Sequence, residues 1–118
     1  MQYPNASQSE SGIYYIVQKA GAGAKPAKGA NVSVRYRGLF LSGKVFDASD
    51  LHGGSLEFKV GVGQVISGWD ETLLDMQKGE KRLVILPPEA AYGERGAGSG
   101  LIPPHSFLVF EMELLDIK

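Results

Sequence analysis

The residues that usually carry enzymatic chemistry form no known pattern in this sequence. Its two histidines, His52 and His105, lie in separate segments, and neither has a second histidine or a carboxylate at the spacing of a metal site. The glycines at 61 and 63 and those between 93 and 100 are not followed by the Lys-Ser/Thr pair of a P-loop. There is no cysteine and no G-x-S-x-G turn, so no nucleophile is indicated. We therefore expect a site without metal, cofactor or covalent intermediate, built from aromatic and aliphatic side chains.

Length and charge narrow the classes of partner. The chain has 118 residues, 43% of them apolar, which suits one compact domain. Its 12 basic and 13 acidic residues leave a formal net charge of −1, so no broad basic face attracts a nucleic acid or an anionic membrane. The acidic residues show no spacing that singles out a catalytic pair and indicate a solvated surface. No apolar run reaches the roughly 18 residues that span a bilayer. We expect a monomer that binds neither nucleic acid nor membrane.

The start of the chain predicts no packed element. Residues 1–12 are rich in Ser, Gln and Asn without an apolar period, so we expect a flexible N-terminal arm followed by one domain, residues 13–118. This polar start also lacks the charged and apolar regions of a secretory leader. We expect a cytoplasmic location, with a periplasmic or exported location as the alternative if a leader has been removed.

Alternation of side chains predicts the strands that must position such a site. In Asn31–Leu41 the apolar residues Val32, Val34 and Tyr36 alternate with polar ones, which is the period of a strand with one buried and one wet face. Such alternation is typical of an antiparallel sheet. Further strands are predicted at residues 13–18, 44–47, 55–60, 80–86 and 107–118.

One amphipathic helix is predicted over Ile66–Lys78. Trp69, Leu73 and Met76 fall at positions i, i+4 and i+7, and Lys78 with Gly79 forms the expected basic last turn and left-handed cap. Together these elements predict an α+β fold, in which a bent antiparallel β-sheet of about five strands wraps over one short amphipathic helix. A long Gly-rich segment between residues 89 and 104 completes the chain, and loops of that length in small domains are usually functional.

Five short motifs share their order and spacing with one enzyme family. They are GAGAKPAKGANVSVRYRG (Gly21–Gly38), GKVFD (Gly43–Asp47), VISGWDE (Val65–Glu71), AYG (Ala91–Gly93) and LIPPHSFLVFEMELL (Leu101–Leu115). In this register they closely resemble the FKBP-type peptidyl-prolyl cis-trans isomerases. The resemblance covers about Ser11–Lys118, and it implies a bent antiparallel sheet on a short helix, in agreement with the pattern of apolar residues.

The resemblance implies an enzyme that accelerates rotation about the bond preceding proline and so assists protein folding. The cis and trans forms of that bond differ by about 1 kcal/mol, but the barrier between them is roughly 18–20 kcal/mol because rotation destroys amide resonance. The twisted amide is less polar than the planar one, so an apolar, water-excluding cavity stabilises it. The implied partners are proline-containing peptides, unfolded or folding proteins, and macrolide inhibitors of the FK506 type. No cofactor is implied.

The resemblance also assigns roles to single positions. Trp69 would form the floor under the proline ring, while Ile66 would offer its backbone N–H, and Tyr92 its hydroxyl, to substrate. Asp47 would polarise the twisting amide or order Tyr36. Without the resemblance, the aromatic residues are equally ordinary core residues. The expected catalytic residues are Asp47, Ile66, Trp69, Tyr92 and Phe110, and the expected substrate-binding residues are Tyr36, Phe46, Leu56, Val65 and Ile102.

Two positions depart from the family pattern. Leu56 falls where many members carry a phenylalanine that walls the site, and His52 falls where many carry an arginine paired with the site aspartate. An imidazole with an ordinary pKa near 6.5 carries that charge only in mildly acidic solution, so any pairing of His52 with Asp47 is expected to depend on pH.

Two other functions compete with the isomerase. The same pocket could hold an apolar side chain of a client without turnover; the intact set of site residues favours activity instead. A small nucleic-acid-binding barrel is disfavoured because the net charge of −1 leaves it no basic face.

Overall fold

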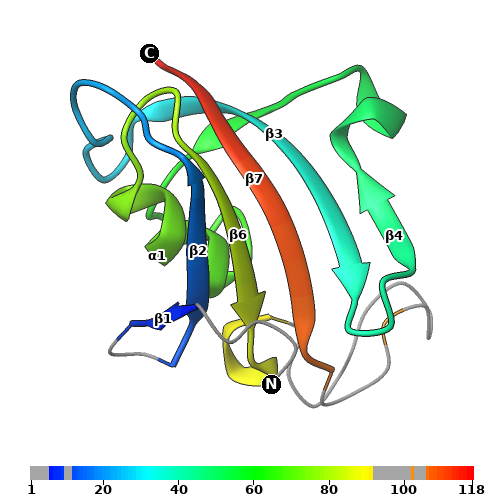
Figure 1. Cartoon of the computed structure of the whole chain (residues 1–118). Helices are drawn as coiled ribbons and strands as arrows, with labels where there is room; N and C mark the ends of the chain where they lie inside the picture. Colours follow the sequence, from blue (N-terminus) through cyan, green and yellow to red (C-terminus); the bar gives the residue numbers. More distant parts are fainter. Residues whose placement is uncertain (1–5, 10–11, 92–101, 103–105) are drawn as a thin grey trace.

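The computed structural model describes residues 6–9, 12–91, 102 and 106–118, with the side chains of all of these except 51 and 52. Within them, one antiparallel sheet has the strand order β1-β2-β6-β7-β3-β4, and β5 pairs with β3 as well (Figure 1). The strands are β1 (Ser7–Gln8), β2 (Tyr14–Lys19), β3 (Asn31–Phe40), β4 (Val45–Ala48), β5 (Leu56–Lys59), β6 (Lys81–Leu86) and β7 (Leu108–Ile117). The helices are the 3-10 turn η1 (Ser49–His52), α1 (Ser67–Asp75) and the 3-10 turn η2 (Pro88–Ala90).

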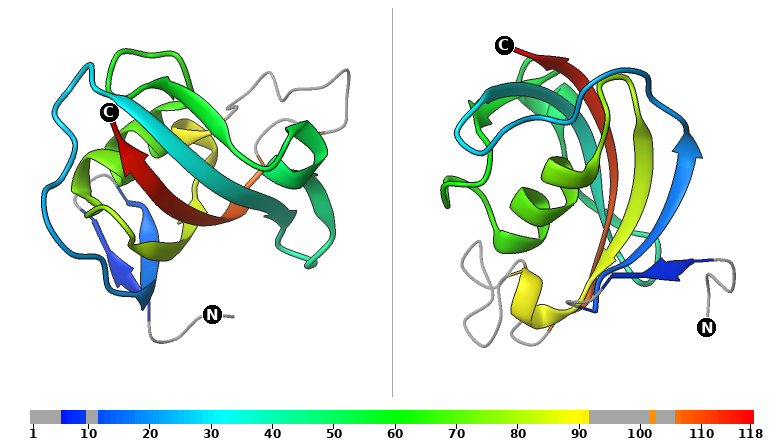
Figure 2. Two further views of the ribbon diagram at one scale, coloured as in Figure 1. Left: turned by 90° about the horizontal axis from the view of Figure 1, so that it is seen from above. Right: turned by 90° about the vertical axis from the view of Figure 1, so that its left-hand side faces the viewer.

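The sheet bends around the helix. The right-hand view of Figure 2 shows β2, β6 and β7 curving past α1, which lies on their concave side. The α+β fold predicted from the sequence is confirmed by this arrangement and by the related structures described below. The described sheet has seven strands where about five were expected, and the strand that no sequence pattern predicted is the two-residue β1 at its margin.

The two longest strands form the centre of the sheet and follow the predicted alternation. β3 pairs with β7 from Val32 opposite Ile117 to Phe40 opposite Leu108. Along β3, Val32, Val34 and Tyr36 are buried, whereas Arg35 and Arg37 are exposed. The outer face is less wet than predicted, because Leu83, Ile85 and Val109 are buried there in a second apolar cluster.

The core lies between the concave face of the sheet and α1. Leu73 and Met76 are fully buried and Trp69 is 5% exposed, so the predicted helical stripe faces the sheet. Burying a large apolar side chain contributes on the order of 2 kcal/mol, so this stripe holds the helix in place although α1 has only nine residues. Gly68 allows the close contact, since a Cβ there would lie 2.7 Å from the carbonyl oxygen of Ala90 and from Leu86.

The helix ends three residues earlier than predicted, at Asp75. Met76 already has an extended backbone, with ψ of 144°, and its N–H bonds back to the carbonyl of Leu73. The next N–H, that of Gln77, donates to the side chain of Glu80 rather than continuing the helical pattern. Gly79 does have the expected left-handed conformation, with φ of 86°, but in the turn that leads to β6. A local side chain, that of Glu80, thus takes the place of the next helical acceptor at this end.

Part of the N-terminal segment is paired with the sheet. Ser7 and Gln8 lie opposite Tyr15 and Tyr14 of β2, and the side chain of Ser9 accepts the N–H of Ile13 at 3.2 Å. The flexibility expected for residues 1–12 stays a prediction. Ile13, the first residue of the predicted domain, packs in the core. In the described part of the chain, no helix is long and apolar enough to cross a membrane.

Candidate active site

A small cavity of about 140 Å³ opens on the concave side of the sheet, where β3, β4, β5 and β7 meet the start of α1. Among the described residues, every predicted site residue other than Ile102 lines it. These residues come from segments far apart in the sequence, so the cavity exists only in the folded chain. The lining residues are Tyr36, Phe46, Asp47, Leu56, Val65, Ile66, Trp69 and Phe110.

Four aromatic rings form the cavity's floor and walls by edge-to-face packing. The ring centroids of Trp69 lie 4.7 Å from those of Tyr36 and 5.2 Å from those of Phe110, with interplanar angles of 70° and 89°. Phe46 meets Phe110 at 5.7 Å and 80°. Such contacts add about 0.5–1.5 kcal/mol each beyond the burial of area. The four rings therefore form an apolar slot.

Gly38 lets two of these rings meet. A Cβ on Gly38 would lie 2.7 Å from Cζ of Phe46 and 2.9 Å from Cε1 of Phe110. Both distances are shorter than carbon atoms can approach, so any larger residue here would displace one wall of the cavity. The sequence signal was present as a glycine inside an otherwise alternating strand, which often marks a close approach.

The polar groups of the cavity are few and oriented. The hydroxyl of Tyr36 donates to Oδ2 of Asp47 at 2.8 Å, and the backbone N–H of Ala48 donates to Oδ1 at 2.8 Å. Asp47 is the one charged side chain among the described lining residues. The backbone N–H of Ile66, at the rim, donates to no hydrogen bond in the described part of the chain. The arrangement offers an apolar slot with one carboxylate and one available donor.

A carboxylate from the helix orders the loop that carries Val65 and Ile66. Asp70 accepts the N–H of Gly61 at 2.7 Å and the N–H of Gly63 at 3.0 Å. Both glycines have positive φ, 81° and 80°, a conformation that other residues avoid. Asp70 falls within the helix predicted over Ile66–Lys78, but its contact with this loop could not be derived from the helical period.

Comparison with known proteins identifies the family. Residues 22–115 match the family model described as FKBP-type peptidyl-prolyl cis-trans isomerase. The chain belongs to this family. Membership confirms the resemblance seen in the motifs and the expected activity, peptidyl-prolyl cis-trans isomerisation, and it does not favour the non-catalytic alternative.

Individual FKBP relatives are similar over almost the whole chain. The FK506-binding protein 1A of Neurospora crassa is 51% identical over 108 residues, covering 91% of this chain and 89% of that protein. The FK506-binding protein 1 of Dictyostelium discoideum is 45% identical, covering 91% and 99%. The crystal structure of AtFKBP13 superposes with a TM-score of 0.91 at 40% identity, covering 97% of this chain and 99% of that one.

Three further residues of the predicted FKBP site, Ile102, Tyr92 and His52, are not among the described lining residues. Ile102 is 4% exposed and packs in the main core cluster. Tyr92 lies outside the described residues, and so does most of the Gly-rich segment. The side chain of His52 also lies outside the described part, so its pairing with Asp47 stays a prediction.

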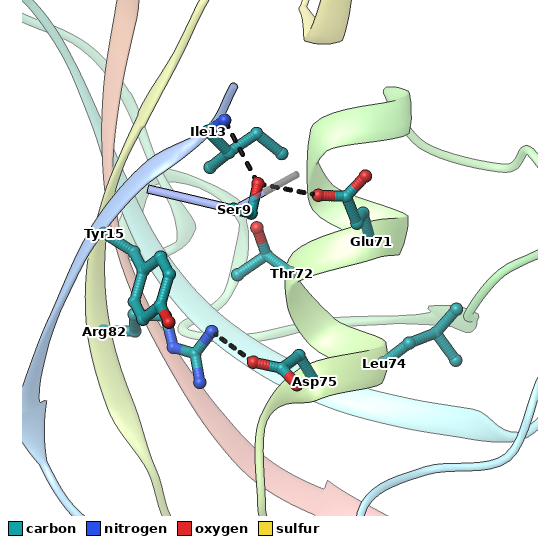
Figure 3. A pocket seen from close by; sticks show the side chains of 8 residues that line it. All are labelled: Ser9, Ile13, Tyr15, Glu71, Thr72, Leu74, Asp75 and Arg82. Atoms are coloured by element: carbon teal, nitrogen blue, oxygen red, sulfur yellow. Dashed lines mark hydrogen bonds and ion pairs between the residues drawn. The ribbon is translucent and has the colours of Figure 1, made fainter. Parts of the chain in front are cut away.

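A larger hollow, of about 780 Å³, lies on the other flank of α1, between the helix and β1, β2 and β6 (Figure 3). Charged groups there already have partners: Arg82 bonds to Asp75 at 3.0 Å and lies 4.7 Å from the ring centroid of Tyr15. Ser9 donates to Glu71 at 3.3 Å. These contacts join the sheet to the helix. No group of three His, Asp or Glu side chains in the described residues is placed to hold a metal ion.

Proposed function

We propose that the 140 Å³ cavity is where this FKBP-type isomerase binds proline and twists the preceding peptide bond. The observation that carries the proposal is the convergence of the aromatic slot, the Asp47 carboxylate and the available N–H of Ile66 in one place. In this proposal Trp69 is the floor under the proline ring, and the rings of Tyr36, Phe46 and Phe110 are its walls. Leu56 and Val65 extend the apolar surface.

The chemistry needs only binding. Rotation makes and breaks no covalent bond, so the protein has to bind the twisted amide more tightly than the planar one. Each 1.36 kcal/mol of that preference raises the rate tenfold. The walls replace water around the less polar transition state, and the N–H of Ile66 fixes a substrate carbonyl so that the remaining part of the amide turns. Asp47, held by Tyr36, places a negative charge beside the turning amide.

The assay of this proposal measures the cis-to-trans rate of short X-Pro peptides by magnetisation-transfer NMR, without added metal or nucleotide. We expect acceleration with Leu or Phe before proline to exceed that with Glu at least tenfold. The reason is that Asp47 is the one charged group among the described lining residues, so it repels an acidic substrate and nothing there attracts it. Rates equal to the uncatalysed ones for all peptides would contradict the function, and equal rates across the series would contradict the site.

Asp47→Ala should lower kcat/KM about tenfold and leave the fold intact. The variant removes the carboxylate that accepts the Tyr36 hydroxyl, and the loss of this half-exposed bond costs about 0.5–1 kcal/mol of stability. Since Asp47 is only half-buried, we expect Tm to fall by no more than about 4 °C. Asp50→Ala is the matched control, because Asp50 is an exposed aspartate of the same segment that does not line this cavity. Equal kcat/KM for both variants would exclude Asp47 from the site.

The proposed ligands follow the relatives. Several relatives are named FK506-binding proteins, so we propose that macrolides of the FK506 type enter the same slot in competition with proline-containing peptides and folding proteins. We also propose that the chain acts as a monomer, because the aromatic slot, the Asp47 carboxylate and the N–H of Ile66 are all supplied by one chain and the proposed reaction needs no second copy. Relatives include a chloroplastic protein of Arabidopsis thaliana and a protein of Escherichia coli, so the family works in several compartments. The cytoplasmic location stays a prediction.

A further inference from the structure

The strand that carries Tyr36 has an interruption in its pairing, directly behind the active site. On one side of β3, Asn31 to Val34 pair with β5 and Arg37 to Leu39 pair with β4. The chain between β4 and β5 leaves the sheet as η1 and a turn with two left-handed glycines, Gly53 and Gly54. On this side of β3 the described strand pairing therefore stops at Val34 and resumes at Arg37.

A serine side chain takes the place of the missing strand. Oγ of Ser49 accepts the backbone N–H of Tyr36 at 3.0 Å and donates to the backbone carbonyl of Tyr36 at 3.3 Å. Ser49 is completely buried, which is unusual for a serine outside a strand and indicates that both bonds are shielded from water. One hydroxyl thus bonds to both the backbone N–H and the backbone carbonyl of Tyr36.

The same serine lies two residues after Asp47, and this proximity couples the two. Tyr36 is held at its backbone by Ser49 and at its hydroxyl by Asp47, 2.8 Å away. Its ring meets the edge of Trp69 at 4.7 Å. Tyr36 is thus connected at both its backbone and its hydroxyl to one short segment, Asp47–Ser49. A shift of Ser49 within that segment therefore moves Tyr36 relative to the Asp47 carboxylate.

We propose that Ser49 is a positioning residue of the isomerase: through its two bonds to the backbone of Tyr36 it sets the distance and direction between the Tyr36 hydroxyl and Asp47. The proposal rests on the proposed function of the cavity. Ser49 lies behind Tyr36 and is absent from the residues that line the described cavity, so its effect on the reaction passes through Tyr36 and Asp47.

A double-mutant cycle in kcat/KM tests this role. Ser49→Ala alone and Tyr36→Phe alone are each expected to lower kcat/KM about tenfold, because small displacements of positioning groups have effects of this order. If Ser49 acts through the Tyr36 hydroxyl, kcat/KM of the double variant should equal that of the less active single variant. Independent effects would instead multiply and lower kcat/KM about a hundredfold below the parent's. Additive losses, or parent kcat/KM in Ser49→Ala, would overturn the proposal. Ser33→Ala is the matched control, since it removes another buried serine hydroxyl of the same region on β3 itself.

A second readout does not depend on activity. Trp69 is the sole tryptophan and touches Tyr36, so its fluorescence emission should shift in Ser49→Ala and stay at the parent position in Ser33→Ala. A parent without isomerase activity would contradict the proposed function, whereas an unshifted emission would contradict the role of Ser49. If Ser49→Ala does not fold, the pair Ser49→Thr and Ser49→Val has equal bulk and differs in the hydroxyl. Higher kcat/KM in Ser49→Thr then supports the proposal, and equal values reject it.

Discussion

Replacing Trp69 with alanine should abolish measurable isomerase activity and lower the free energy of unfolding by about 3–5 kcal/mol. The indole is 5% exposed and touches Tyr36, Phe58 and Phe110, so its removal opens a void beneath the walls of the slot. Small domains are stable by only about 5–15 kcal/mol, so the loss is a large fraction of the total. Urea denaturation gives the stability, and the NMR exchange assay gives the activity.

Trp69→Phe is the matched control for that variant. Nε1 of Trp69 is buried and has no hydrogen-bond partner in the described part of the chain, so phenylalanine removes an unpaired donor while keeping an aromatic floor. We expect Trp69→Phe to retain most of the activity and to lose less than half the stability lost by Trp69→Ala. A Trp69→Ala variant with the parent's unfolding curve would show that the indole is not part of the core.

The elements whose apolar residues follow a regular period could be predicted from the sequence. The alternation in β3 and the i, i+4, i+7 spacing in α1 placed Tyr36, Trp69, Leu73 and Met76 on buried faces, as the structure has them. Periodicity predicts burial in these elements because each has one buried face, and the position of a residue in the repeat determines whether its side chain lies on that face. The motifs then indicated which of these core residues lie at a cavity.

The polar residues that support the site and the end of α1 could not be predicted in this way, because the repeat within an element does not show which backbone groups a side chain reaches. Ser49 matters because β4 and β5 leave an interruption beside Tyr36, and Asp70 matters because its carboxylate reaches the loop at Gly61 and Gly63. The end of α1 likewise depends on Glu80, a residue beyond the helix. Each of these is a pairing between a polar group and a backbone segment, for which the local pattern carries no signal.

A second large loss of stability is expected for Arg82→Met, on the opposite flank of α1. Arg82 points into the protein from β6, and its side chain and that of Glu80 are each 7% exposed. Nε of Arg82 bonds to Glu80 at 2.7 Å. Nη1 of Arg82 bonds to Asp75 at 3.0 Å (Figure 3). Methionine keeps much of the length but removes the cation, leaving Glu80 buried beside the N–H of Gln77 alone. Breaking such a buried pair on one side costs about 3–5 kcal/mol.

The double variant Glu80→Gln with Arg82→Met distinguishes two free energies. One is the penalty for leaving the Glu80 carboxylate buried and unpaired, and the other is the net stabilisation by the Glu80–Arg82 ion pair. Glutamine still accepts the N–H of Gln77 through its amide oxygen but carries no charge, so the double variant should recover most of the stability that Arg82→Met loses. Urea denaturation of the four proteins gives the coupling. If the double variant were as unstable as Arg82→Met, the loss would come from packing around Tyr15 and not from an unpaired carboxylate. Activity below the melting transition should equal that of the parent in all of them, because neither Glu80 nor Arg82 lines the cavity proposed as the active site.

The pH dependence of stability in acid tests the interaction between Arg82 and Asp75. Burial raises the pKa of this carboxyl, but hydrogen bonds and charge from Lys25 and Arg82 outweigh it, so the pKa in the folded protein lies below its ordinary value. A lowered pKa stabilises the fold above the ordinary value, near 3.8, and this contribution is lost as the pH falls through the folded pKa. Arg82→Met removes one of the two cations, so its stability should fall less steeply than the parent's below about pH 4. The difference in stability between parent and variant should therefore be larger at pH 7 than at pH 3, and a difference independent of pH would show that Arg82 and Asp75 do not interact in solution.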